Sequence, residues 1–223
     1  MEQFQLPEFR DLTLWQLAIT HKSYAREHGG GDNERLEFLG DAILTFLSGE
    51  YLYCRYPDRS EGELSPLRAA LVDEQQLSYF ADRLGLQQRL RLSRGAEKNN
   101  SRHSRRVLCS TFEAMIGAYF LDCDRNVDPV RAYVIPLFDS VAEQVNNTAL
   151  QVNYKSRFQI WALDQLGLVP SYTIISATGP DHAKQFTAEV RVKGLLYGRG
   201  QGRRKQDAEK NAARAALKKV EAL

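Results

Sequence analysis

The sequence has few cysteines and no long apolar run. Its three cysteines, Cys54, Cys109 and Cys123, lie far apart, are odd in number and form no CxxC pair. This pattern argues against a disulfide framework and a zinc site, and it favours a reducing, cytoplasmic setting. No stretch of roughly 18 or more apolar residues is present, which argues against a membrane span. The first ten residues also lack the basic-then-apolar pattern of a signal peptide.

Internal repeats and low-complexity tracts are absent as well, so the 223 residues have to be explained by ordinary globular domains. This length suits two small domains, and 43% apolar residues are enough to form a core. The overall charge of +2 is unevenly divided. Residues 154–223 hold 13 basic and 6 acidic side chains, whereas residues 1–153 hold 17 basic and 22 acidic ones. We therefore expect a basic binding module attached to an acidic unit.

The first 145 residues show apolar side chains near the helical period of 3.6 residues. We expect an all-α domain here, in which Pro136 kinks or splits the last helix. The polar stretch at residues 146–148 opens an expected linker over residues 146–152. The predicted helices span residues 12–25, 34–53, 63–84, 106–122 and 127–145.

From residue 153 onward the pattern changes to a helix followed by short alternating segments. A helix is expected over residues 154–166, and strands over residues 172–177, 185–192 and 195–200. The turn at residues 178–181 separates the first two strands. An Ala-, Lys- and Arg-rich helix over residues 203–223 completes an α-β-β-β-α order, which is typical of a compact α+β module over residues 153–223.

Charge placement in this second module indicates a polyanion as its ligand. Arg203, Arg204 and Lys205 open the last helix, where backbone amides also favour phosphate oxygens. Gly179 and Pro180 begin a turn that includes His182, and Gln159 lies one helical turn after Lys155. A basic helix face is also compatible with simple exposure to solvent.

The module resembles a double-stranded RNA-binding domain over its whole length. The resemblance implies that Gln159 and the loop with Pro180 and His182 enter successive minor grooves. It also implies that Arg203, Arg204 and Lys205 contact the phosphates between those grooves, over about 16 base pairs. The family usually has a second lysine where this sequence has Gln206, so we expect Arg204 to compensate and the affinity to be tuned.

The segment NERLEFLGDAIL at residues 33–44 carries the sharpest chemical signal. Glu37 and Asp41 are four residues apart and share one helix face, with Glu34 one turn earlier. Stacked carboxylates are costly unless a cation lies between them, and such oxygen ligands suit Mg²⁺ or Mn²⁺. Neutralisation by Arg35 and Lys22 is the alternative explanation.

The same segment resembles the signature of the ribonuclease III endonuclease domain, and further matches occur at residues 20–24, 60–65 and 111–118. Together the matches cover roughly residues 12–145. The resemblance implies an all-helical, homodimeric fold with a valley for double-stranded RNA. It implies metal ligands at Glu37, Asp41 and Glu113, and at position 110, with Asp41 and Glu113 as catalytic residues. Glu34 and Glu61 match supporting acidic positions.

This resemblance implies an endoribonuclease that is specific for double-stranded RNA and processes ribosomal and other structured precursors, including mRNA. Phosphodiesters would be hydrolysed by water activated by Mg²⁺, for which Mn²⁺ substitutes. The expected partners are double-stranded RNA and a second copy of the chain, without a membrane or a small-molecule organic cofactor.

Ser110 departs from the family pattern, because an aspartate is expected at this ligand position. A neutral hydroxyl binds Mg²⁺ more weakly than a carboxylate does, so the activity is expected to be impaired. Three explanations of Ser110 are open. It is an engineered change that silences the enzyme, or it is natural and leaves slower cleavage that Mn²⁺ favours. In the third, the protein is a relative that binds RNA without cutting it. The rival hypothesis is therefore a catalytically silent dimeric RNA-binding protein. A structural protein without a nucleic-acid role would leave the basic cap and loop unexplained.

Overall fold

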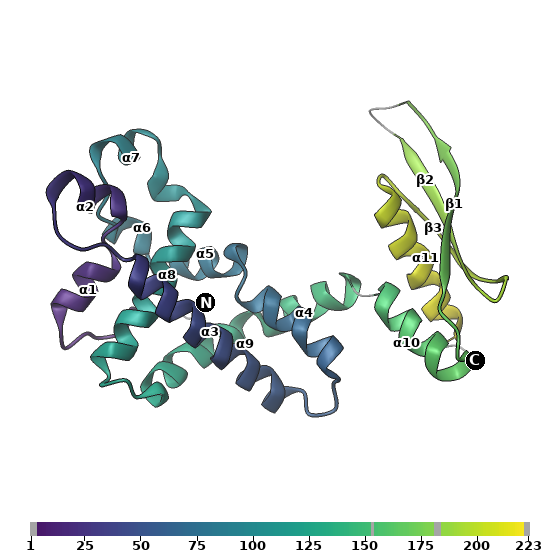
Figure 1. Ribbon diagram of the computed structural model, residues 1–223, viewed down its shortest axis with the longest axis horizontal. Coiled ribbons are helices and arrows are strands. Elements are labelled where there is room, and N and C mark those ends of the chain that lie inside the picture. Colours follow the sequence, from purple (N-terminus) through teal and green to yellow (C-terminus); the bar gives the residue numbers. More distant parts are fainter. Residues whose placement is uncertain (1–3, 153, 181–183, 221–223) are drawn as a thin grey trace. The chain divides into compact units, whose positions relative to one another are not determined.

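The computed structural model describes residues 4–152, 154–180 and 184–220, and it divides into two compact units (Figure 1). Unit 1 spans Met1–Asn146 and unit 2 spans Asn147–Leu223. None of the helices within the described ranges is long and apolar enough to cross a bilayer. Both predicted fold classes are confirmed, since unit 1 is built from helices and unit 2 combines helices with a three-stranded sheet.

Unit 1 packs its helices around α8 (Arg105–Asp122), which is buried along most of its length. α8 packs against α3 (Glu34–Arg55), α5 (Glu74–Arg83) and α1 (Leu12–Ala18). The fully buried side chains of the core include Leu44, Leu47, Leu67, Phe80, Phe112, Met115 and Phe138. The remaining elements are α2 (Lys22–His28), α4 (Glu61–Leu71), α6 (Leu86–Arg89), α7 (Arg94–Lys98), η1 (Ser101–His103) and α9 (Val127–Val152).

Two of the helices expected in unit 1 are each divided in the structure. The segment 12–25 forms α1 and α2, because Thr20 leaves the helix to form a β-bridge with Arg91. The segment 63–84 contains α4 and α5, because the Asp73 carboxylate accepts a hydrogen bond from the Gln76 N–H at 2.7 Å and starts a new helix. Residues 93–104, which lie between two of the predicted helices, contain α7 and η1.

The expected break at Pro136 does not divide α9, which runs from Val127 to Val152 as one helix. Proline removes a single helical hydrogen bond, and the buried side chains of Val134, Leu137 and Phe138 hold this part of α9 in the core. The segment 146–152, expected as a linker, is the helical end of α9, since it contains neither proline nor glycine to stop the helix.

Unit 2 has the predicted α-β-β-β-α order, and its antiparallel sheet has the strand order β1-β2-β3. The helices pack on one face of this sheet, over a core that includes Phe158, Ala188, Val190 and Leu217. An ideal Cβ at Gly198 or Gly200 would lie 2.3 or 2.1 Å from the backbone of Ala212, so only glycine allows the last helix to approach β3 this closely. The elements are α10 (Tyr154–Leu166), β1 (Ser171–Thr178), β2 (Gln185–Val192), β3 (Leu195–Gly202) and α11 (Lys205–Val220).

Candidate active site

The candidate active site lies where α3 and α8 cross with their backbones in contact. A Cβ on Gly40 would lie 1.8 Å from the backbone oxygen of Glu113, and a Cβ on Gly117 would lie 2.3 Å from that of Leu36. Glycine at both positions therefore allows the two helices to touch. Glu37 and Asp41 flank Gly40 on α3, so the crossing brings their carboxylates next to Glu113 on α8.

The Glu113 carboxyl group carries the clearest electrostatic sign of this clustering. Its pKa is raised to about 7, mainly because the group is half-buried and further because Asp41 and Glu37 carry like charges. The Cys109 thiol partly offsets this effect by donating a hydrogen bond to Glu113 Oε1 at 3.7 Å. A bound cation would relieve the same repulsion.

Ser110 lies inside this group of carboxylates. Its hydroxyl donates a hydrogen bond to Glu37 Oε1 at 2.9 Å, and its side chain is half-buried. Position 110 therefore faces the expected metal ligands, but the serine supplies a hydrogen-bond donor where a carboxylate would supply charge. Among the residues described, no three His, Cys, Asp or Glu side chains are close enough together to form a ready metal site.

A polar cavity of about 290 Å³ opens beside Glu37 and Ser110. It is also lined by His21, Lys22, Asn33, Glu34, Arg106 and Val107. Lys22 Nζ forms an ion pair with Glu34 Oε1 at 2.8 Å, and burial lowers the pKa of the His21 imidazole. The Arg106 side chain has no hydrogen bond or ion pair to any residue that the structure describes. The cavity thus joins cationic groups to the carboxylate cluster.

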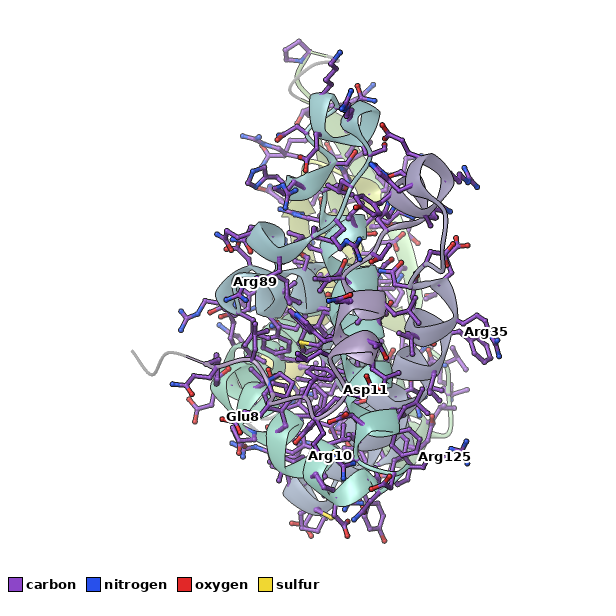
Figure 2. All side chains as sticks on the ribbon, turned by 90° about the vertical axis from the view of Figure 1, so that its left-hand side faces the viewer. Glu8, Arg10, Asp11, Arg35, Arg89 and Arg125 are labelled. Atoms are coloured by element: carbon purple, nitrogen blue, oxygen red, sulfur yellow. The ribbon has the colours of Figure 1, made fainter. Side chains whose placement is uncertain are left out.

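The proposed neutralisation of Glu37 and Asp41 by Arg35 and Lys22 is not what the side chains do. Lys22 pairs with Glu34, and Arg35 is exposed at the edge of the unit (Figure 2). Within the described ranges, the Arg35 side chain has no hydrogen bond or ion pair. Glu37 and Asp41 consequently form no ion pair with either of these basic residues.

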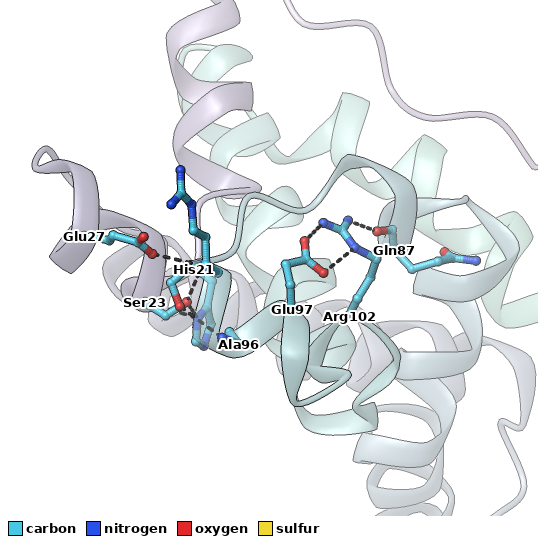
Figure 3. A network of polar contacts seen from close by, with 9 residues as sticks. His21, Ser23, Glu27, Gln87, Ala96, Glu97 and Arg102 are labelled. Atoms are coloured by element: carbon cyan, nitrogen blue, oxygen red, sulfur yellow. Dashed lines mark hydrogen bonds and ion pairs between the residues drawn. The ribbon is translucent and has the colours of Figure 1, made fainter.

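The start of α2 is fixed by the polar segment before α8 (Figure 3). The Ser93 N–H donates to Ser23 Oγ at 3.1 Å, and the Arg94 N–H donates to Glu27 Oε2 at 3.0 Å. Arg102 in turn contacts Glu97 and the backbone oxygen of Gln87. These contacts hold His21 and Lys22 at the rim of the cavity.

The structure separates the two acidic residues that were expected to support the site. Glu34 lines the cavity beside Glu37, whereas Glu61 lines a different cavity of about 340 Å³ with Tyr53 and Arg68. Glu61 accepts a hydrogen bond from the Ser65 hydroxyl at 2.7 Å.

The sequence did not predict Arg106 as a cavity residue. Its position one helical turn before Ser110 was the available signal.

In unit 2, the expected RNA-binding residues that the structure describes are exposed. Gln159 is exposed on α10, Pro180 is exposed in the β1–β2 connection, and His182 lies outside the described residues. Lys155, by contrast, is engaged in an ion pair with Glu209 at 2.7 Å. Arg203 and Arg204 precede α11, and Lys205 is its first residue. In the described part of the chain, the side chains of these three residues form no hydrogen bond or ion pair. Their charges are available to a ligand.

Comparisons with known proteins find a family match for each of the two units. Residues 11–134 match the family model described as ribonuclease-III-like, and residues 154–220 match that of the double-stranded RNA binding motif. The chain is 49% identical to "Ribonuclease 3 1" of Nostoc sp. over 96% of this chain and 95% of that protein. It is 41% identical to "Ribonuclease 3" of Roseiflexus sp., over 96% of this chain and 91% of that protein.

Solved structures give the same result. The nuclease domain of ribonuclease III from Campylobacter jejuni is 37% identical, with a TM-score of 0.56, over 60% of this chain and 90% of that domain. Dicer from Pichia stipitis is 26% identical, with a TM-score of 0.54, over 97% of this chain and 98% of that chain. The chain belongs to the ribonuclease III family.

Proposed function

We propose that this chain is an endoribonuclease that is specific for double-stranded RNA and acts on ribosomal and other structured RNA precursors. The observation that carries the proposal is the crossing of α3 and α8, at which burial, together with the like charges of Asp41 and Glu37, raises the pKa of Glu113 to about 7. Three carboxylates brought together at this crossing, beside a polar cavity that Glu37 lines, fit metal-assisted hydrolysis better than a binding role alone. The matches of both units to family models support the same activity.

Carboxylate oxygens are the ligands that Mg²⁺ and Mn²⁺ prefer, so the donor types of Glu37, Asp41 and Glu113 fit a divalent cation. A bound cation supplies Lewis-acid chemistry, which activates water for attack on phosphorus. The chain's own part is to hold these carboxylates in place through the helix crossing. Glu113 has to lose its proton before it binds a cation, so cation affinity should rise through neutral pH.

Ser110 weakens this site in two ways. The serine adds no negative charge, and its hydroxyl occupies Glu37 Oε1 at 2.9 Å. Replacing one carboxylate of a four-ligand set by a hydroxyl lowers affinity for hard divalent cations. We therefore propose that the chain cleaves slowly and that Mn²⁺ supports cleavage better than Mg²⁺.

Unit 2 supplies most of the affinity for the duplex in this proposal. Gln159 and the connection with Pro180 and His182 contact minor grooves, and Arg203, Arg204 and Lys205 contact phosphates, over about 16 base pairs. Joining this unit to the nuclease unit raises the effective concentration of RNA at the carboxylates. An acidic nuclease unit can therefore work on a polyanion.

A homodimer is part of the proposal, and one face of α3 supports it. Phe38, Phe46 and Tyr53 lie on that face and are 79%, 55% and 75% exposed. Aligned apolar side chains of this kind are typical of a protein interface. The similar nuclease domain from C. jejuni has a structurally flexible region that is involved in dimer formation. The three free cysteines fit the cytoplasmic setting that we propose.

The alternative function is a catalytically silent dimeric protein that binds double-stranded RNA. Ser110 is the specific observation that favours it, because the remaining three carboxylates form no ready metal site within the described residues. In that case the nuclease fold would serve as a dimerisation platform.

Cleavage of labelled double-stranded RNA by the full chain with Mg²⁺ or Mn²⁺ tests the proposal. We expect slow cleavage by the Ser110 protein and cleavage faster by at least about tenfold for Ser110→Asp, with similar RNA affinity. Glu113→Gln in the Ser110→Asp protein is the matched control and should abolish cutting. Binding without cleavage by all versions, including Ser110→Asp, would favour the silent alternative.

A further inference from the structure

A broad groove of about 790 Å³ lies in unit 2 between one side of α11 and residues of all three strands, most of them on β3. We refer to it as the β3 groove. It is lined by strand residues of the sheet and by one side of α11, including Thr187, Arg199, Asn211, Arg214 and Lys218. Figure 1 shows α11 lying against β3 along the length of the strand.

The charge of the β3 groove is positive. In the described part of the chain, Arg199, Arg214 and Lys218 line it and no Asp or Glu does. Arg199 is paired with a carboxylate outside the groove, since Glu189 forms ion pairs with Arg191 at 2.8 Å and with Arg199 at 2.7 Å. The groove therefore offers positive charge that no carboxylate within it cancels.

Two of these cations are free to bind a ligand. Among the described residues, the Lys218 side chain has no hydrogen bond or ion pair, and neither has the Arg214 guanidinium, which lies 5.7 Å from the centre of the Tyr154 ring. Arg214 and Lys218 are four residues apart on α11, so their side chains are neighbours on one helix face. Such a pair fits adjacent phosphates of one nucleic-acid strand.

The edge of β3 is not open to another strand. The Asn211 side-chain amide donates to the Gln201 carbonyl at 2.7 Å, and Lys219 Nζ donates to the Leu196 carbonyl at 3.3 Å. Because side chains of α11 occupy these edge carbonyls, addition of a peptide strand is disfavoured. A ligand recognised by charge fits the β3 groove better than one recognised by backbone pairing.

The β3 groove is separate from the residues expected to contact RNA. Gln159, Pro180 and residues 203–205 do not line it. Lys218 lies 13 positions after Lys205 on α11, which corresponds to about 20 Å along the helix. Side chains alternate between the two faces of a strand, and Ala188 and Val190 face the helices. Glu189, which lies between them and pairs with Arg199, therefore points to the opposite face of the sheet.

We propose that the β3 groove is a second contact surface for the phosphodiester backbone of double-stranded RNA. Unit 2 would then hold duplex RNA through its expected face and, by Arg214 and Lys218, through this groove. A single domain with two such surfaces can contact two segments of a folded RNA or two duplexes. This inference rests on the proposed binding of double-stranded RNA.

The test is the salt dependence of binding of the full chain to a fluorescein-labelled 30-base-pair RNA duplex in EDTA, followed by fluorescence anisotropy. Loss of one phosphate contact lowers the slope of log K against log salt by about 0.9. We expect Lys218→Ala to lower it by about that amount and to weaken binding by about threefold or more. Arg214→Ala/Lys218→Ala should lower the slope by about twice as much.

Lys219→Ala is the matched control, since Lys219 is the adjacent exposed lysine on α11 and does not line the groove. Equal effects of Lys218→Ala and Lys219→Ala, or no effect of the Arg214/Lys218 double variant, would overturn the inference. A larger effect on binding to polyglutamate or to anionic lipid vesicles than on binding to RNA would also overturn it. If the unaltered chain does not bind the duplex, the proposed function itself fails.

Discussion

Gly40→Ala is the substitution that probes most sharply how the carboxylates are positioned. The new Cβ would lie 1.8 Å from the Glu113 backbone oxygen, whereas ordinary van der Waals contact begins near 3.4 Å. A backbone oxygen cannot rotate away, so α3 and α8 have to separate by roughly 1.6 Å, the difference between these distances. Overpacking of this kind costs about 3 kcal/mol, and the better helix propensity of alanine returns about 1. We expect a net loss of about 2 kcal/mol in unit 1.

The assay is urea unfolding followed by tryptophan fluorescence. In a Trp161→Phe background the only tryptophan left is Trp15, which lies in unit 1, so the signal reports that unit. Gly62→Ala in α4 is the control, because a Cβ at Gly62 meets nothing within 4 Å. It should leave stability unchanged or raise it. Equal unfolding midpoints for Gly40→Ala and Gly62→Ala would refute the close crossing.

Three further predictions concern titration and charge. The pKa of Glu113 is about 7 in the folded state and its ordinary value is 4.5, so the folded state binds more protons than the unfolded state between these pH values. The free energy of unfolding should therefore fall as pH rises from 4.5 to 7. Glu113→Gln should flatten this decline, as measured by urea unfolding in EDTA. A decline of unchanged slope in the variant would contradict this. Arg106→Ala should weaken RNA binding in EDTA by about threefold, by analogy with one lost phosphate contact. The control is Arg105→Ala, because Arg105 is exposed but does not line the cavity, and it should weaken binding less in the same anisotropy assay. Equal losses for the two arginines would exclude a specific role for the cavity. Arg203→Ala/Arg204→Ala should lower the salt slope of RNA binding by about 1.8, and an unchanged slope would argue against phosphate contacts there.

The sequence predicted the element types well where periodicity was strong. The helix containing Glu37 and Asp41 and the three strands of unit 2 lie close to their expected limits. The breaks at Thr20 and Asp73 were missed, because one depends on a β-bridge to distant Arg91 and the other on a single N-cap within an apolar pattern. Proline at position 136 was given too much weight, since tertiary packing keeps α9 continuous.

The candidate site was predictable only in part. Helical spacing paired Glu37 with Asp41, but the approach of Glu113 depends on two glycines that allow α3 and α8 to touch. No spacing rule links residues more than 70 positions apart, so the Ser110 to Glu37 hydrogen bond was not foreseen. The pairing of Lys22 with Glu34 likewise depends on where α2 is fixed.

Binding of Mn²⁺ to the full chain, measured by electron paramagnetic resonance at pH 8, tests the central claim most directly. The claim is that the crossing of α3 and α8 builds a divalent-cation site that lacks one carboxylate at Ser110. We expect weak binding of Mn²⁺ by the Ser110 protein, affinity higher by at least about tenfold in Ser110→Asp, and loss of this site in Glu37→Gln. Identical Mn²⁺ affinities in all three proteins would contradict the account.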